Sequence, residues 1–191
     1  MLKQAFSAAV IAASVSTAHA GAIDFRIGSS VAELSYLTQT ASFGYGGADI
    51  GFGLLGNDNN DFLLNASILV SGNSTGDVKG LHFGVGLKAY GGTLDDPKNN
   101  QDGAAVAISA KVRYVIPGTV PLAVLGEAAF APDITSFSDF NGVNEYRVAL
   151  EYEVTPSARA YVGYRKLEVE SNDRPDHDVD NSAHIGVRFE F

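Results

Sequence analysis

Histidine, serine and carboxylate side chains are the residues of this chain that could catalyse hydrolysis, because a histidine activates a serine nucleophile when a carboxylate orients it. His82, His184, Ser109 and Glu127 all fall on the polar faces of segments that alternate polar and apolar residues. A catalytic pair must lie within hydrogen-bond distance, and nothing in their spacing places any two of them together. We therefore expect that the protein is not an enzyme. The alternative is a lipid hydrolase or acyltransferase.

Four aspartates gather near the end of the chain, at Asp173, Asp176, Asp178 and Asp180. Carboxylate oxygens suit Ca²⁺ and Mg²⁺, but the segment lacks the glycine and the glutamate that an EF-hand loop requires. We expect a solvated acidic loop, with no resident metal and no other cofactor. The alternative is a divalent-cation loop that bridges to phosphate groups of lipid outside the cell.

Charged residues of both signs also recur singly within segments whose polar faces are otherwise rich in glycine, alanine and serine. A buried charge is costly unless an opposite charge matches it. Such faces therefore predict ion pairs within a narrow lumen, where small neighbours leave room for long side chains. The predicted lumen charge network consists of Lys88, Lys111, Arg113, Glu127, Arg147, Glu151, Arg165 and Arg188.

Alternation with period two runs through most of the chain and predicts β-strands. In 104–114, for example, Val106, Ile108 and Val112 share one face, and Lys111 and Arg113 share the other. Eight clear strands are predicted, near 48–55, 61–71, 80–91, 103–116, 121–131, 144–154, 158–170 and 182–191.

The segment 22–40 is less regular than the eight clear strands. Ser30-Val31-Ala32-Glu33 fits a helix capping box, whereas 31–37 also fits a strand. A barrel with both termini on one side needs an even strand number, so a strand at 31–38 would require a tenth at 22–28. We expect eight strands, with ten as the alternative.

The N-terminal segment, the absence of long apolar stretches and the net charge indicate where the protein is located. Residues 1–20 combine Lys3, a short apolar run and Ala18-His19-Ala20, the pattern of a cleavable signal peptide. Residues 21–191 then form one domain, without any segment of ~20 continuous apolar residues for a transmembrane helix. The chain contains no cysteine, and its net charge of −9 argues against nucleic-acid binding.

The apolar stripes could face a soluble core or lipid. A soluble barrel surrounds an apolar interior with a dense polar surface, whereas a membrane barrel inverts that arrangement. The small and sparsely charged polar faces favour the inverted arrangement. The expected fold is an all-β, antiparallel transmembrane β-barrel, integral to the outer membrane of a Gram-negative bacterium.

The final strand carries a second indication. Ile185, Val187, Phe189 and Phe191 share one face and end in an aromatic residue, which resembles the assembly signal of outer-membrane barrels. Gly126-Glu127, Phe130-Ala131-Pro132-Asp133, Gly163-Tyr164-Arg165-Lys166-Leu167 and Gly186 to Phe191 resemble the YfaZ family, small predicted outer-membrane proteins of proteobacteria. The resemblance implies an outer-membrane barrel and supplies no catalytic residues.

A small barrel of this kind predicts a structural or surface-interaction role, since eight strands leave an interior that side chains fill. A narrow, porin-like channel for ions or small solutes is the alternative, and ten strands would favour it. The expected partners are outer-membrane lipids, lipopolysaccharide and, during insertion, the barrel-assembly machinery of the cell envelope.

Overall fold

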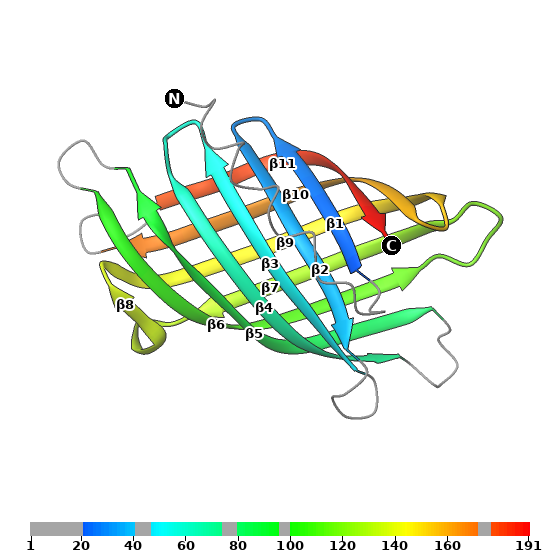
Figure 1. Cartoon of the computed structure of the whole chain (residues 1–191), viewed down its shortest axis with the longest axis horizontal. Helices are drawn as coiled ribbons and strands as arrows, with labels where there is room; N and C mark the ends of the chain where they lie inside the picture. The colour runs from blue at the N-terminus through cyan, green and yellow to red at the C-terminus, as the bar shows by residue number, and fades with distance from the viewer. Residues whose placement is uncertain (1–20, 41–46, 74–79, 96–99, 172–176) are drawn as a thin grey trace.

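The computed structural model describes residues 21–40, 47–73, 80–95, 100–171 and 177–191, which form an antiparallel β-structure (Figure 1). The predicted signal peptide, residues 1–20, lies outside the described residues. Within the described part, no helix is long and apolar enough to cross a membrane. The strands are β1 (Gly21–Gly28), β2 (Val31–Thr40), β3 (Ala48–Asn57), β4 (Phe62–Asn73), β5 (Leu81–Leu94), β6 (Gln101–Val115), β7 (Leu122–Ala131), β8 (Ser136–Ser138), β9 (Phe140–Thr155), β10 (Ala158–Ser171) and β11 (His177–Glu190).

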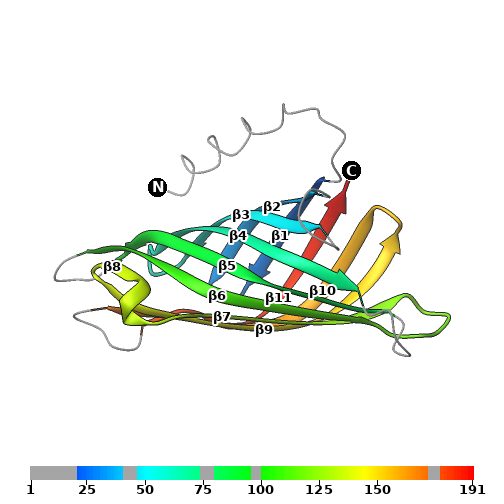
Figure 2. The same cartoon turned by 90° about the horizontal axis from the view of Figure 1, so that it is seen from below.

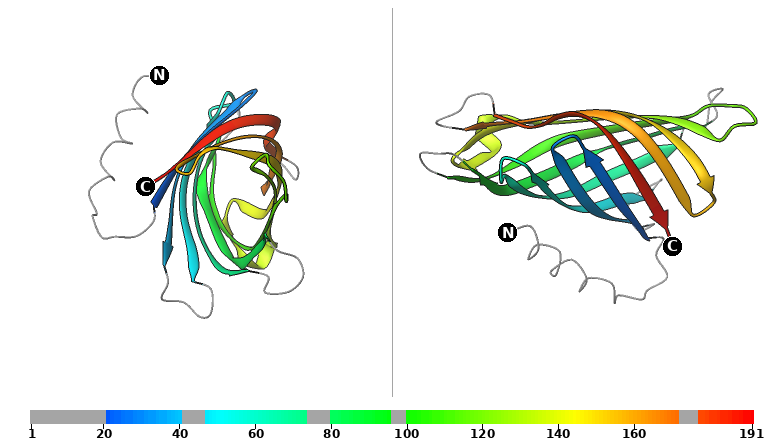
Figure 3. Two further views of the ribbon diagram at one scale, coloured as in Figure 1. Left: turned by 90° about the vertical axis from the view of Figure 1, so that its right-hand side faces the viewer. Right: turned by 90° about the horizontal axis from the view of Figure 1, so that it is seen from above.

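Ten of these strands close into a barrel. Each pairs with its neighbours in chain order, β7 pairs with β9, and β1 pairs with β11 to close the wall. Strand β8 is an additional short strand that pairs with β6 at 103–105 and follows the 3₁₀ turn η2 (Asp133–Thr135). Figures 2 and 3 show the tilted strands surrounding one interior. Gly21 and Phe191 exchange backbone hydrogen bonds of 2.8 Å, so the start of β1 and the end of β11 share one end of the barrel, here called the terminal end.

The prediction of eight strands is wrong, and the ten-strand alternative is correct. The two additional strands are β1 and β2, which occupy the irregular segment 22–40. In β1, Ile23, Phe25 and Ile27 point outward while Asp24 and Arg26 are buried inside. A helix at 30–33 is also wrong, since Val31 already begins β2.

The two faces of the wall have opposite character. Outward-pointing side chains are apolar and exposed, as at Ile108 (67% exposed) and Val148 (58%). Inward-pointing positions alternate with them and carry buried charges such as Glu145, Arg147 and Arg165. This is the arrangement of a membrane barrel, in which lipid surrounds the apolar face and polar groups fill the lumen.

The lumen is not polar along its whole length. At the end opposite the termini, called the distal end, inward side chains pack into an apolar cluster whose members are at most 4% exposed. We call this cluster the apolar plug because its members come from nine of the ten barrel strands. Its members are Val31, Leu55, Leu63, Tyr90, Leu94, Ala105, Ala107, Ala129, Ala131, Phe140, Val143, Leu167, Val169 and Val179.

Candidate functional site

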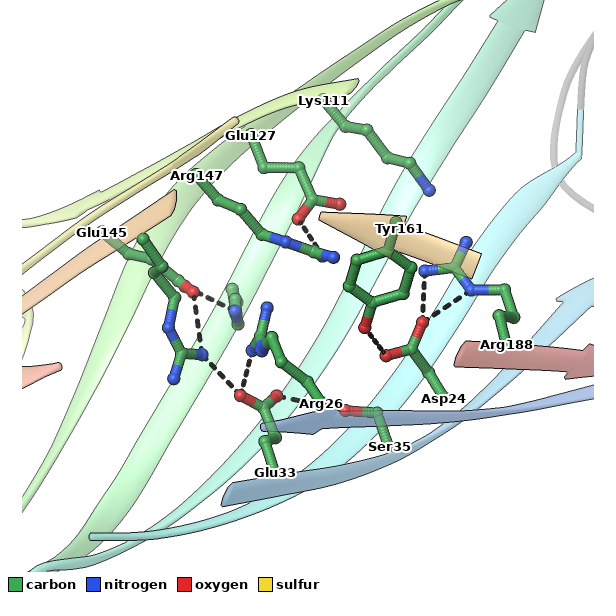
Figure 4. A network of polar contacts seen from close by, with 12 residues as sticks. Asp24, Arg26, Glu33, Ser35, Lys111, Glu127, Glu145, Arg147, Tyr161 and Arg188 are labelled. Atoms are coloured by element: carbon green, nitrogen blue, oxygen red, sulfur yellow. Dashed lines mark hydrogen bonds and ion pairs between the residues drawn. The ribbon is translucent and has the colours of Figure 1, made fainter. Parts of the chain in front are cut away.

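The eight residues of the predicted lumen charge network all face the interior, and each is held in an ion pair. Five of the pairs connect strands around the lumen, as Figure 4 shows in part. The nitrogen–oxygen distances are 2.5 Å for Lys88–Glu145, 3.8 Å for Lys111–Asp49, 2.6 Å for Arg113–Glu151, 3.0 Å for Arg147–Glu127 and 2.8 Å for Arg188–Asp24.

Arg165, the eighth residue, is the hub of the network. It lies on β10 and is 1% exposed. Its Nε donates to Asp180 Oδ2 at 2.6 Å and its Nη1 to Glu33 Oε2 at 2.5 Å, while Glu145 lies 3.6 Å away. Glu33 also accepts from Arg26. One guanidinium group thus binds β2, β9, β10 and β11 together, and Glu33 joins β1 to them through Arg26.

Three charged members of this network lie on the two strands that were not expected. Asp24, Arg26 and Glu33 point inward from β1 and β2, and each forms an ion pair. The signal for them was the alternation of Ile23, Phe25 and Ile27 with charged residues. Once 22–40 is taken as two strands, their parity places these charges in the lumen.

The network is close to electrically neutral. Its ion pairs join seven basic and seven acidic side chains within the described residues. Pairing of this kind offsets the cost of burying the charges. The basic members are Arg26, Lys88, Lys111, Arg113, Arg147, Arg165 and Arg188, and the acidic members are Asp24, Glu33, Asp49, Glu127, Glu145, Glu151 and Asp180.

A cavity of about 90 Å³ lies within the network, on the terminal side of the apolar plug. Charged groups of both signs line it, among them Arg26, Glu33, Lys88, Glu127 and Arg147. Ser35, Asn65 and Ser109 add uncharged polar groups. A space of this size and polarity holds a few waters or one small solute.

The four aspartates of the predicted divalent-cation loop do not lie together where the structure describes them. Asp180 is in β11 and bonds to Arg165, because it shares the inward face of the strand with Ser182 and His184. Asp178 is exposed, whereas Asp173 and Asp176 lie outside the described residues. Among the described residues, no group of three or more metal-binding side chains is placed to hold an ion.

A second polar cluster, called the rim latch, lies at the distal end of the barrel. Asp61 Oδ2 accepts from Asn57 Nδ2 at 2.8 Å and from His177 Nε2 at 2.7 Å, and Asp61 Oδ1 accepts from the backbone of Asp95 at 2.9 Å. Burial acts to raise the pKa of Asp61, but these hydrogen bonds outweigh it and hold that pKa below its ordinary value. The latch joins three distal connections of the barrel.

The histidine, serine and carboxylate residues considered for hydrolysis do not form a triad. His184 is 2% exposed, and neither of its ring nitrogens has a hydrogen-bond partner in the described residues. His82 lies near the start of β5 and is exposed, whereas Ser109 is buried beside the cavity. Nothing in these positions provides an activated nucleophile.

One sequence motif of hydrolases does occur, at Gly72-Asn73-Ser74-Thr75-Gly76. A nucleophile elbow of G-x-S-x-G form requires a turn from a strand into a helix. Here the segment connects two antiparallel strands, since Gly72 on β4 pairs with Phe83 on β5. Residues 74–76 lie outside the described residues, but the antiparallel pairing around them is not the context of an elbow.

A family model described as YfaZ precursor matches residues 2–191. The chain belongs to the YfaZ family. The match extends the resemblance seen in the C-terminal motifs over the whole sequence, including β1 and β2. This YfaZ protein is therefore an outer-membrane β-barrel. No curated protein matches it.

Solved structures with a similar fold are outer-membrane proteins. The NanC porin superposes on this YfaZ barrel with a TM-score of 0.54 at 16% identity, covering 91% of this chain and 100% of the porin. The outer-membrane channel DcaP of Acinetobacter baumannii gives 0.45 at 12% identity, covering 88% of this chain and 54% of DcaP. At these identities the likeness to NanC shows the fold alone.

The predicted assembly signal of the YfaZ barrel lies on its final strand. Ile185, Val187 and Phe189 point outward from β11 and are 65%, 37% and 54% exposed, and Phe191 follows at the end of the chain with 69%. The four side chains thus form an apolar stripe on the outside of the seam with β1. Recognition by the assembly machinery stays a prediction.

Proposed function

We propose that this protein is a sealed outer-membrane barrel with a structural and surface-interaction role. The observation that carries the proposal is the apolar plug, in which buried side chains from nine of the ten barrel strands pack together at the distal end of the lumen. Its larger members, such as Leu55, Leu63, Phe140 and Leu167, are 1–2% exposed. A hydrophobic constriction blocks ions because water does not wet it.

The distal end supports the surface-interaction part of the proposal. Ile134 on η2 is 88% exposed and Phe137 on β8 is 58% exposed, although both lie beyond the main wall of the barrel. Exposed apolar side chains on a loop at the rim suit contact with lipopolysaccharide or with an apolar partner. The loop projects from one end of the barrel in Figure 2.

Conductance in planar bilayers tests the sealed lumen. We expect the purified barrel to insert without steady unitary currents. Heat-modifiable migration on an unboiled gel would verify that the same preparation is folded. Reproducible openings of a single size from the folded barrel would overturn the proposal.

The second candidate is a narrow channel for ions or small solutes, and the polar cavity is the observation that favours it. Charges of both signs line the cavity, and the NanC porin has the same fold. Conduction would require the apolar plug to move. A current altered by substitution of Arg113 or Arg147 would support this candidate.

We also propose that export removes residues 1–20. In support, Gly21 is the first residue of β1 and bonds to the backbone of Phe191, so a cut after Ala20 leaves the wall intact. An intact mass that starts at Gly21 would support this, and a mass that includes residues 1–20 in the folded membrane protein would oppose it.

A further inference from the structure

We infer that the lumen cavity is a binding site for one small, hydrogen-bond-accepting anion, such as a halide, nitrate or a one- or two-carbon carboxylate. This goes beyond the sealed-barrel proposal, because a sealed lumen requires no ligand. Hydrogen-bond donors that line the cavity have no partner in the part of the chain that the structure describes, and an anion would supply one.

The unused capacity consists of guanidinium donors. Arg26 Nε and Arg147 Nε and Nη2 are fully buried and have no hydrogen-bond partner in the described residues. Both arginines line the cavity and are 5% and 6% exposed. An unpaired buried donor costs about 1–3 kcal/mol, so three such donors around one cavity point to an acceptor that fills it.

Two of the carboxylates that line the cavity already accept several hydrogen bonds each. Glu33 accepts from Arg26, Arg165 and Ser35. Glu145 Oε2 accepts from Lys88 and Tyr90, both at 2.5 Å. A water can fill a donor site only by directing its own hydrogens elsewhere, whereas an anion accepts from several donors and needs no acceptor in return.

Arg147 is fixed in place and cannot turn its free donors toward another carboxylate. Its Nη1 donates to Glu127 at 3.0 Å, and its guanidinium carbon lies 4.9 Å from the centre of the Tyr161 ring. The Tyr161 hydroxyl is held in turn by Asp24 at 2.5 Å. Figure 4 shows Arg147 directed at Glu127 and Arg26 directed at Glu33.

Size restricts the ligand. A cavity of about 90 Å³ holds on the order of a few waters, which admits chloride, bromide, nitrate, formate or acetate.

The test uses the full-length folded barrel in detergent and the line width of ³⁵Cl⁻ in NMR spectra. We expect excess broadening by the wild-type protein that millimolar acetate or nitrate reverses. Arg147→Lys keeps the positive charge beside Glu127 but replaces the planar, forked guanidinium donors with one compact ammonium group, so the excess should fall at least several-fold. Arg26→Lys makes the same replacement beside Glu33 and should act in the same direction.

Arg159→Lys is the matched control. Arg159 pairs with Glu190 at the terminal end, with 2.9 Å between Arg159 Nη2 and Glu190 Oε1, and does not line the cavity, so the control should retain the wild-type broadening. Heat-modifiable migration checks that every variant is folded. The inference is overturned if folded wild-type protein gives no excess broadening, or if both cavity variants broaden chloride as strongly as the wild type. Neither result depends on whether the barrel conducts.

Discussion

Arg147 and Arg165 lie directly opposite each other on the neighbouring strands β9 and β10. Like charges in this position destabilise a sheet, yet here each guanidinium turns to a different carboxylate. Arg147 bonds to Glu127 on β7, and Arg165 bonds to Glu33 on β2 and Asp180 on β11. The pair is tolerated because acids from three other strands neutralise it.

Removal of the hub should therefore destabilise the barrel strongly. Arg165→Met leaves Glu33 and Asp180 without their shared partner, and we expect a loss of about 3–5 kcal/mol in the free energy of unfolding. Urea titration followed by migration on unboiled gels measures it. The control Arg159→Met breaks a pair that is partly exposed to solvent and should cost ~0–1 kcal/mol. Equal losses in the two variants would contradict the hub.

Removing part of the apolar plug should create a current. Phe140→Ala with Leu167→Ala empties space at the distal end, and each substitution costs about 2–5 kcal/mol of stability. We expect the folded double variant to show small unitary conductances in planar bilayers, unlike the wild type. Val148→Ala, on the lipid face, should stay silent. A double variant that is folded and silent would place the seal elsewhere.

The rim latch should lose its effect in acid. The folded pKa of Asp61 is lowered, so its contribution is complete above the ordinary Asp value of about 4 and is lost as pH falls through the folded pKa. Asp61→Asn should cost about 1–3 kcal/mol at pH 7. We expect the difference in urea midpoint between the two proteins to shrink below about pH 4. A difference that is independent of pH would show that the carboxylate charge does not matter.

The orientation of the wall can be tested with a charge on its outer face. Leu87 points outward near the middle of β5 and is 51% exposed to the surroundings. Leu87→Arg should cost about 2–4 kcal/mol in phospholipid bilayers, and Val154→Arg, near the end of β9, only ~0–1 kcal/mol. Equal costs at the two depths would argue against a lipid-facing position.

Alternation was sufficient to predict the barrel and eight of its strands, because lipid outside and charge inside impose a strict period of two. It was insufficient for β1 and β2. In β2 the inward face mixes Val31 and Leu37 with Glu33, since β2 contributes to both the apolar plug and the charge network. That mixture weakens the period-two alternation of β2, so the sequence fits a helix capping box at 30–33 as well as it fits a strand.

Parity also placed the basic residues of the network correctly on the inner face, but it could not choose their partners. Arg165 and Glu33 are separated by 132 positions and meet only because the barrel closes between β1 and β11. Asp180 was assigned to a loop because the predicted final strand began at 182, whereas β11 begins at His177. The apolar plug was missed because its alanine and leucine residues lie on the otherwise polar faces of the strands. There they look like interruptions of the polar–apolar alternation and not like members of a separate core.

The seam between β1 and β11 has a consequence for biogenesis. It joins the two strands furthest apart in chain order, and the Asp24–Arg188 ion pair lies on it. Before the seam forms, both strands expose unpaired backbone groups, which lipid cannot satisfy. The unpaired edges of β1 and β11 must therefore be shielded until the two strands pair. A factor that assists this closure has to bind both strands at the same time.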